Sequence, residues 1–478
     1  MTTSELKYKN PIVYGLSILF ILINAFVIYY FGFIYLSLFP IVLLVAIIGF
    51  YSYDKLFFLI AFLTPLSLSL SYFYPDSSFN ISIFTEPLLI FLLFIMFFKF
   101  LLYHKIRTDI FFHPITIAIL FYLLWILITT VTSTLPLVSL KFFLSKIWLI
   151  IPVFFLGLGI FNKTSNIKLF IWAYAIALFI VVIYSTYNLS QTSFLTKNAS
   201  HFVVKPFFKD HTSYGAILAM FVPVLWGLAS LKNKKIYKKI SALVLAIVFS
   251  GGLFLSYSRA AWISLIVAFA VWTFVKLKIK FKYLVAFGLI AGVLTFSFWF
   301  QIMNKLEKNQ QDSSSNISEH IVSMTNVSTD ASNLERLNRW QCAIEMFKEK
   351  PIVGWGPGTF QFQYAPFQLE RMRTIISTNF GDVGNAHSEY LGPLAEQGVL
   401  GLIAFLFLAI TIIIYGLRAS KYAINKTDEV IALTATLGLI SYFIHGFMNN
   451  FLDSDKLAIP FFAFSAIIVA IDLKNKNS

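Results

Sequence analysis

Long apolar stretches recur along the chain, and each is close to the ~20 residues that a helix needs to cross the hydrocarbon core of a membrane. Of the 478 residues, 58% are hydrophobic and only 12% are charged, whereas charged residues make up roughly a quarter of soluble globular proteins. Backbone polar groups in lipid must be satisfied within the spanning structure, and the short alternating strands typical of a membrane barrel are absent. The sequence therefore predicts an all-α polytopic membrane protein.

The apolar runs predict about fourteen transmembrane helices, or about twelve if some runs are re-entrant or merged. The predicted spans are 12–30, 34–50, 56–72, 84–102, 115–133, 146–161, 167–188, 212–231, 238–256, 258–275, 281–300, 398–417, 430–447 and 457–472. They divide the chain into membrane helices over 1–300, a large and mostly helical loop over 301–397, and membrane helices over 398–478. The first apolar run follows Lys7 and Lys9 without a small-residue cleavage site, so we expect a retained signal anchor.

The basic residues predict the orientation of these helices. With the amino terminus inside, every predicted inner turn is basic, whereas outer turns such as 71–82 and 133–139 hold almost no Lys or Arg. This orientation places 188–211, 256–259, the long loop and 445–456 on the outer side. We therefore expect both termini on the cytoplasmic side of the membrane and the long loop on the outer side.

The net charge of +15 follows this topology, so it does not indicate nucleic acid as a partner. Basic residues on the translocated side nevertheless need a separate reason, and an anionic ligand on the outer face would supply one. The candidates are Lys205, Lys209, Arg259, Arg336, Arg339, Arg371 and Arg373. The single Cys342 excludes an internal disulfide and a cysteine-based metal site.

The core of the long loop predicts a helix and a glycine turn. Apolar residues at helical spacing run from Leu337 to Phe347 and end at Pro351, and Arg336 shares a face with Trp340. The glycines of 354–358 favour a turn with positive φ. A phosphate cradle is the weaker alternative, because the lysine of a P-loop is absent.

Two residues on the outer side admit both a structural and a chemical interpretation. A lone histidine such as His387 is usually structural, yet at the boundary of water and lipid it can accept a proton from a hydroxyl. Arg259 either snorkels to the interface or holds a diphosphate in its fork of donors. Asp210, with His211, precedes a span and is expected to cap its helix. An outer cluster of His445, Asn449, Asn450 and Asp453 is expected at most to form hydrogen bonds with a glycan.

In their order, these motifs resemble the O-antigen ligase and Wzy-type polymerase family of bacterial polysaccharide assembly. The resemblance covers roughly half of the chain, 200–417. It rests on the segment Lys205 to Tyr214, the Ser258-Arg259 corner, Arg336-x-x-x-Trp340, Pro351-x-x-Gly354-x-Gly356-x-Gly358-x-Phe360, His387 and Glu396-x-Gly398-x-x-Gly401. The chain has Lys205 where the family often has Arg, and His211 where it often has Asn.

The resemblance implies an inverting, metal-independent glycosyltransferase without a cofactor, acting on the periplasmic face. Its donor would be a glycan on undecaprenyl diphosphate, and its acceptor a hydroxyl of a glycan, of lipid A-core or of a protein. His387 would be catalytic, and the diphosphate would be bound by Arg259, Arg336, Arg339 and Lys205. The supporting residues would be Trp340, Asp210, His211, Asn385 and Glu389.

Other functions remain open. Within the family, a ligase for lipopolysaccharide, a polysaccharide polymerase and a protein O-oligosaccharyltransferase share these motifs. A flippase or transporter for lipid-linked oligosaccharides is the non-enzymatic alternative. Two features disfavour it: the predicted spans are nearly free of buried charge, and no internal repeat is visible. A non-catalytic scaffold is disfavoured by the outer cluster of Arg, His and Gly.

Overall fold

The structure is a computed structural model that describes residues 3–32, 34–74, 81–103, 108–192, 203–231, 235–279, 331–369 and 384–476. It divides into two compact units, Met1–Phe57 and Phe58–Ser478. The first unit contains α1 (Thr3–Phe31), η1 (Ile34–Leu38), α2 (Phe39–Tyr51) and the beginning of α3 (Tyr53–Leu63).

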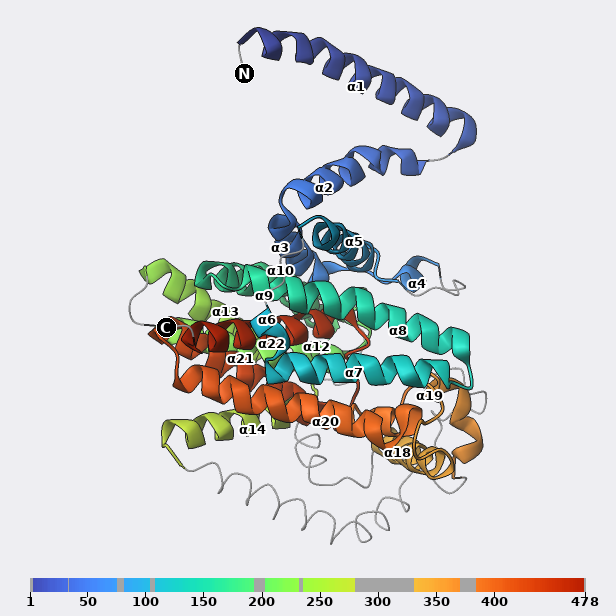
Figure 1. The fold of residues 1–478 in the computed structure, drawn as a ribbon, viewed down its shortest axis with the longest axis vertical. Helices are drawn as coiled ribbons and strands as arrows, with labels where there is room; N and C mark the ends of the chain where they lie inside the picture. Colours follow the sequence, from blue (N-terminus) through green and yellow to red (C-terminus); the bar gives the residue numbers. More distant parts are fainter. Residues whose placement is uncertain are drawn as a thin grey trace. The chain divides into compact units, whose positions relative to one another are not determined.

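The second unit contains the remaining helices, and Figure 1 shows several of them running side by side. In chain order they are η2 (Thr64–Leu66), α4 (Leu70–Phe73), α5 (Thr85–Tyr103), α6 (Thr108–Phe111), α7 (Pro114–Val131), α8 (Pro136–Ile150), η3 (Ile151–Leu156), α9 (Gly157–Ile160), α10 (Thr164–Thr192), α12 (His211–Ser230), α13 (Ile236–Leu255), α14 (Arg259–Lys276), α18 (Ala331–Glu349), α19 (Phe360–Gln363), η5 (Ala365–Phe367), α20 (Leu391–Lys421), α21 (Lys426–His445) and α22 (Asp455–Lys476).

The fold class is confirmed, because 11 of the described helices are long and apolar enough to cross a membrane. Strands are absent from the part of the chain that the structure describes, apart from an isolated bridge between Ser69 and Ser82. The predicted span 56–72 is wrong as a single helix, because α3 ends at Leu63 and a short 3-10 turn that contains Pro65 follows it. Proline has no backbone N–H to donate, which disfavours continuation of an α-helix. The span 34–50 forms the shorter apolar helix Leu36–Tyr51, and 281–300 lies outside the described residues.

Close packing of small residues holds the centre of the second unit together. α22 is buried along its whole apolar length, and α12 and α21 are largely buried. A Cβ built on Gly438 of α21 would lie 2.4 Å from the carbonyl oxygen of Met220 in α12, and one on Gly416 of α20 would lie 2.1 Å from Thr436 Oγ1. Such close approach of backbones is the usual way in which helices associate in lipid, where there is no hydrophobic drive between them.

The turns predicted on the inner side lie together at one end of these helices. Asp428, in the first turn of α21, accepts hydrogen bonds from Lys474 Nζ and Thr164 Oγ1, each at 2.7 Å. Asp472 lies 3.4 Å from Arg418 Nε. The distribution of Lys and Arg and the tertiary contacts therefore agree on which turns share a side.

The expectation that the spans are nearly free of buried charge is wrong. Lys146, Asp428 and Asp472 are buried, and each lies in a helix that is apolar enough to span. All three are paired: Lys146 lies 2.8 Å from Asp453, and the two aspartates have the partners named above. A charged residue in lipid is stable only when it is paired. The mean apolarity of a helix does not report such pairs, so the sequence pattern did not reveal these three residues.

The packing between α12 and α21 generates a stability prediction. Gly438→Ala should lower the free energy of unfolding by about 1 to 3 kcal/mol, because the added methyl meets a backbone carbonyl that cannot move aside. Gly251→Ala is the matched control, since nothing lies within 4 Å of its Cβ, and it should stabilise α13 by about 0.5 to 1 kcal/mol. Thermal unfolding of the purified variants in one detergent measures both, and equal shifts would contradict the packing.

Candidate functional site

The predicted helix in the long loop is confirmed as α18, and it contributes to a small hydrophobic core. Cys342 and Met346 of α18 pack with Phe360, Tyr364 and Ala386. Burial raises the pKa of the Cys342 thiol to about 12, so this cysteine is an inert part of the core. The helix is thereby held against the segment that follows it and against the residues before α20.

The glycine turn is also confirmed, and it docks on the beginning of α20. Gly354, Gly356 and Gly358 have φ of 68°, 113° and 74°. The amide of Gly356 donates to the carbonyl oxygen of Glu396 at 2.7 Å. The carboxylate of Glu396 accepts from the amides of Gly358 and Phe360, each at 2.9 Å. These two amides already bind an anion from the chain itself, which disfavours the phosphate-cradle interpretation.

A kink in α20 completes this contact. Gly398 has φ 70° and ψ −168° inside the helix, and a Cβ there would lie 2.1 Å from the carbonyl oxygen of Ile352. The freed amide of Val399 donates to the carbonyl oxygen of Pro351 at 2.9 Å. The predicted boundary between loop and membrane helix, 397/398, falls at this kink.

His387 lies in a strained turn that three neighbours hold in place. Its φ is 48°, a left-handed value that is uncommon for a residue other than glycine. Its amide donates to Asn385 Oδ1 at 3.0 Å, and Trp340 Nε1 donates to its carbonyl oxygen at 3.4 Å. Arg339 Nη1 donates to the carbonyl oxygen of Asn385 at 3.3 Å. Such strain persists only where the surroundings over-determine it, and it clusters at functional sites.

Arg339 is held in place by contacts with its neighbours in α18 and in the segment that follows. It is buried, its Nε lies 2.8 Å from Glu335 Oε1, and its guanidinium carbon lies 4.8 Å from the centre of the Tyr364 ring. A Cβ built on Gly384 would lie 1.8 Å from Arg339 Nη1, so the loop passes directly over the guanidinium. The geometry favours a structural role for Arg339 over the predicted contact with diphosphate.

The imidazole of His387 lies in a field of positive charge. Burial and the cations of Arg336, Arg339 and Lys209 together lower its pKa to about 3, and Asp210 opposes them. His387 is therefore within electrostatic range of Arg336 and Lys209. At neutral pH the ring is uncharged and able to accept a proton.

Asp210 caps α12, as predicted. Its Oδ1 accepts from the amides of Thr212 and Ser213 at 3.0 and 2.8 Å. Burial opposes ionisation, but these hydrogen bonds and His211 hold the pKa of Asp210 below its usual value. Asp210 is therefore a fixed negative charge beside the imidazole of His387, and His211 is buried at the beginning of the helix.

Arg259 begins α14 at a second strained corner. Tyr257 has φ 52°, and the hydroxyl of Ser258 is buried without a hydrogen-bond partner among the described residues. A Cβ built on Gly215, in the second turn of α12, would lie 2.8 Å from Ser258 Cβ. The corner of Arg259 therefore packs on the helix that Asp210 caps, whereas Lys205 is exposed on the segment before it.

Glu389 connects the His387 turn to the loop between α21 and α22. Its amide donates to the carbonyl oxygen of Gly446 at 2.8 Å, and its Oε1 accepts from the hydroxyl of Tyr442 and the amides of Phe451 and Leu452. Burial raises the pKa of the carboxyl, which these donors only partly offset. Glu389 therefore aligns two loops that are far apart in the sequence.

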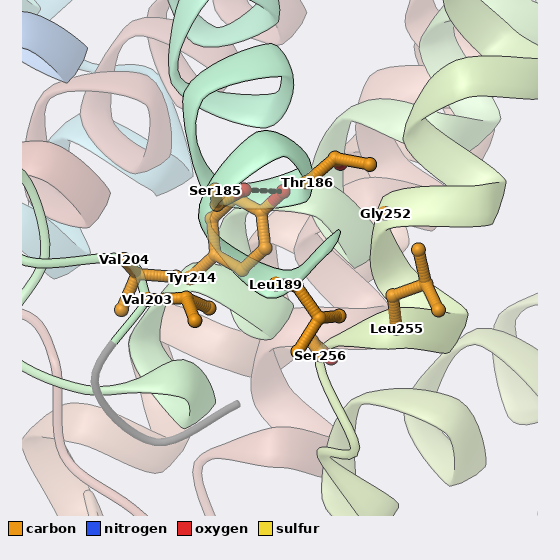
Figure 2. Close-up of a pocket in the computed structure, with 9 residues that line it drawn as sticks. All are labelled: Ser185, Thr186, Leu189, Val203, Val204, Tyr214, Gly252, Leu255 and Ser256. Carbon is orange, nitrogen blue, oxygen red and sulfur yellow. Dashed lines mark hydrogen bonds between the residues drawn. The ribbon is translucent and has the colours of Figure 1, made fainter. Parts of the chain in front are cut away.

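Two hollows lie near these residues. A cleft of about 380 Å³ is bordered by Lys209, residues 384–386 and 388–389, and the loop after α21. A second hollow, of about 10 Å³, lies among α10, α12 and α13 beside the hydrogen bond between Ser185 and Tyr214, which Figure 2 shows. The second is large enough for about one water molecule and too small for a sugar.

Sequence reasoning missed the residues that position the site across long distances in the chain. Lys146 donates to Asp453 and to the carbonyl oxygen of Leu452, each at 2.8 Å, and so fixes the loop that Glu389 also binds. A lone lysine within an apolar run was the available signal. Arg371 and Arg373 lie outside the described residues.

Comparison with known proteins agrees with the motifs. Residues 243–406 match the family model described as O-antigen ligase. This stretch of the chain is therefore similar to an O-antigen ligase domain. It runs from α13 to the first half of α20 and includes Arg259, Arg336 and His387, whereas Lys205 to His211 precede it.

A curated relative extends the similarity without naming an activity. It is an uncharacterized protein of Haemophilus influenzae, 26% identical over 247 residues, which cover 48% of this chain and 55% of the relative. The chain therefore matches about half the length of this relative. What the comparisons show is the similarity of residues 243–406 to the O-antigen ligase family.

The surroundings of His387 predict how acid affects stability. Its pKa is about 3 in the folded protein against 6.5 for the free side chain, so between these values unfolding takes up a proton, and stability falls as the pH falls. From pH 7.5 to 5, wild type should lose about 2 kcal/mol more than His387→Gln, which cannot titrate. Thermal unfolding at the two pH values measures this, and equal losses would show that the ring is not held neutral.

Proposed function

We propose that the protein is an inverting, metal-independent glycosyltransferase that moves a glycan from undecaprenyl diphosphate to an acceptor hydroxyl. The observation that carries the proposal is an uncharged imidazole, His387, held beside the Arg336 guanidinium and Lys209 within an O-antigen ligase domain. A group-transfer reaction with a diphosphate leaving group needs one proton acceptor and fixed positive charge. This arrangement supplies both.

In the proposed step the acceptor oxygen attacks the anomeric carbon from the face opposite the diphosphate. A carbon–oxygen bond to the acceptor forms, the bond from the anomeric carbon to the diphosphate oxygen breaks, and the configuration inverts. The hydroxyl proton passes to His387, and undecaprenyl diphosphate leaves with the electron pair. Negative charge therefore grows on the phosphate as positive charge grows on the imidazole.

Arg336 and Arg259 are proposed to bind the diphosphate. Arg336 lies within electrostatic range of His387, and Arg259 begins an 18-residue helix, whose amino-terminal amides favour an anion. The unpartnered hydroxyl of Ser258 at the same helix end is a further donor for a phosphate oxygen. Lys205 adds positive charge from an exposed position, and Arg339, held by Glu335, positions the turn of His387.

Binding of the donor would strengthen the base. In the ligand-free protein the neighbouring cations lower the pKa of His387. A bound diphosphate would offset their charge and so raise this pKa towards the reaction pH, where general-base catalysis is most effective. The proton acceptor would therefore become competent only after the leaving group is in place.

The sidedness of the reaction is part of the proposal. The segments predicted outside meet at one end of the helices: the amide of Thr134 donates to the carbonyl oxygen of Trp355, and Glu389 binds the loop after α21. The basic inner turns meet at the other end. We assign the first end to the periplasm of a bacterial inner membrane, both termini to the cytoplasm, and the chemistry to the loop 301–397.

The acceptor decides the biological role. A ligase transfers the glycan to lipid A-core, a Wzy-type polymerase transfers it to another lipid-linked repeat, and a protein O-oligosaccharyltransferase transfers it to a protein hydroxyl. We place the ligase first, since the matching family model carries that description. A flippase is the non-enzymatic alternative, and the buried ion pairs of the spans remove one argument against it.

Transfer in detergent tests the proposal. Purified protein with a lipid-linked glycan and an acceptor should form product without a membrane compartment, which a flippase would not do. Relative to wild type, His387→Ala should lower kcat by 100-fold or more, and Arg336→Ala should lower kcat/KM by about 100- to 1000-fold. The control Lys235→Ala, exposed on a predicted inner turn, should keep full activity. Near-normal turnover by His387→Ala in folded protein would remove the imidazole from the mechanism.

A further inference from the structure

The cleft beside the His387 turn presents hydrogen-bond acceptors that lack donors. Gln397 is 1% exposed, lines the cleft, and its Oε1 has no partner among the described residues. Asn450 Oδ1, across the cleft on the loop after α21, is likewise without a described partner. All donors to Glu389 bind its Oε1, so no described residue binds Oε2.

The other carboxylates of the cleft are already satisfied. Glu396 binds the amides of Gly358 and Phe360 through both oxygens. Asp453 accepts from Lys146 Nζ at 2.8 Å and from Asn450 Nδ2 at 3.4 Å. The last contact also fixes the orientation of the Asn450 amide, with its oxygen left unpaired. The cleft is therefore not a cluster of free carboxylates poised for a cation.

Gln397 Oε1 and Asn450 Oδ1 would each gain a hydrogen bond from a ligand that carries donors. A buried polar atom without a partner costs about 1 to 3 kcal/mol, and a ligand that supplies the missing donor recovers it. Hydroxyl groups are such donors, and the ring of Phe142 in the cleft wall offers an apolar face to the carbon–hydrogen side of a sugar. The volume of about 380 Å³ suits a small ligand of one or two sugar units.

We propose that this cleft is a subsite for a neutral, hydroxyl-rich sugar unit adjacent to the reacting one. Residues 384–386, 388 and 389 form one wall, whereas His387 is not among the residues that line the cleft. A sugar held here would lie against the turn that carries the proposed proton acceptor. The inference rests on the proposed transferase function for its meaning, and the sugar belongs either to the acceptor or to the donor glycan.

Direct binding tests the subsite. Free neutral disaccharides, such as lactose, should bind the full-length protein in detergent, and saturation-transfer NMR measures this binding. Gln397→Met and Asn450→Ala should each weaken lactose binding about three- to tenfold. Asn475→Ala is the matched control: Asn475 Oδ1 also lacks a described partner, but it lies in the last turn of α22, away from the cleft. Unchanged binding in both variants, or no binding of any neutral disaccharide to wild type, overturns the proposal.

Kinetics distinguish the source of the sugar and separate the two proposals. Gln397→Met should raise one KM three- to tenfold and leave kcat unchanged. A raised acceptor KM assigns the subsite to the acceptor, and a raised donor KM assigns it to the donor glycan. If wild type binds lactose but transfers no glycan, the proposed function fails and the subsite stands. If transfer proceeds and Gln397→Met changes neither binding nor KM while its thermal stability matches wild type, the subsite alone fails.

Discussion

Positive charge beside a buried imidazole is the constraint on which the site depends. Arg336, Arg339 and Lys209 all disfavour protonation of His387, and only Asp210 opposes them. Like charges do not gather at the edge of an apolar bundle without a partner or a ligand, because each must be taken partly out of water. Glu335 partners Arg339. A bound diphosphate would offset part of the positive charge around the imidazole, and this would also make His387 a better base.

The fold holds this cluster with carboxylates that bind backbone amides. Glu396 fixes the glycine turn, Glu389 fixes the loop after α21, and Asp210 fixes the first turn of α12. Each contact joins segments far apart in the chain or lies at a helix end, and each satisfies backbone amides that would otherwise lack an acceptor. Three acidic side chains thus hold the scaffold through the protein's own amides.

Much of the architecture was predictable because it depends on local sequence. Apolar length predicted the spans, glycines predicted the turn of positive φ at 354–358, and Asp210 predicted a helix cap. The break at Pro65 was also a local signal, and it was overlooked within a longer apolar run. The family was recognisable because its motifs keep their order along the chain.

The arrangement of the site was not predictable in the same way. That Glu396 binds Gly358 and Phe360, that Lys146 holds the loop of Asp453, and that Gln397 and Asn450 face one cleft are properties of residues tens to hundreds of positions apart. No local pattern reports such a pairing. The structure also makes Arg339 a weaker candidate for binding phosphate. An arginine is a suitable residue type for that role, but the burial of Arg339 and its pairing with Glu335 favour a structural role.

The most direct measurement is a cryo-EM structure of the full chain in a lipid nanodisc with undecaprenyl diphosphate bound. The account predicts density for the phosphates within hydrogen-bond distance of the guanidinium groups of Arg336 and Arg259, with the His387 ring beside the outer phosphate. Density for the phosphates at the opposite end of the helices, or guanidinium groups too far apart to share one headgroup, would contradict it.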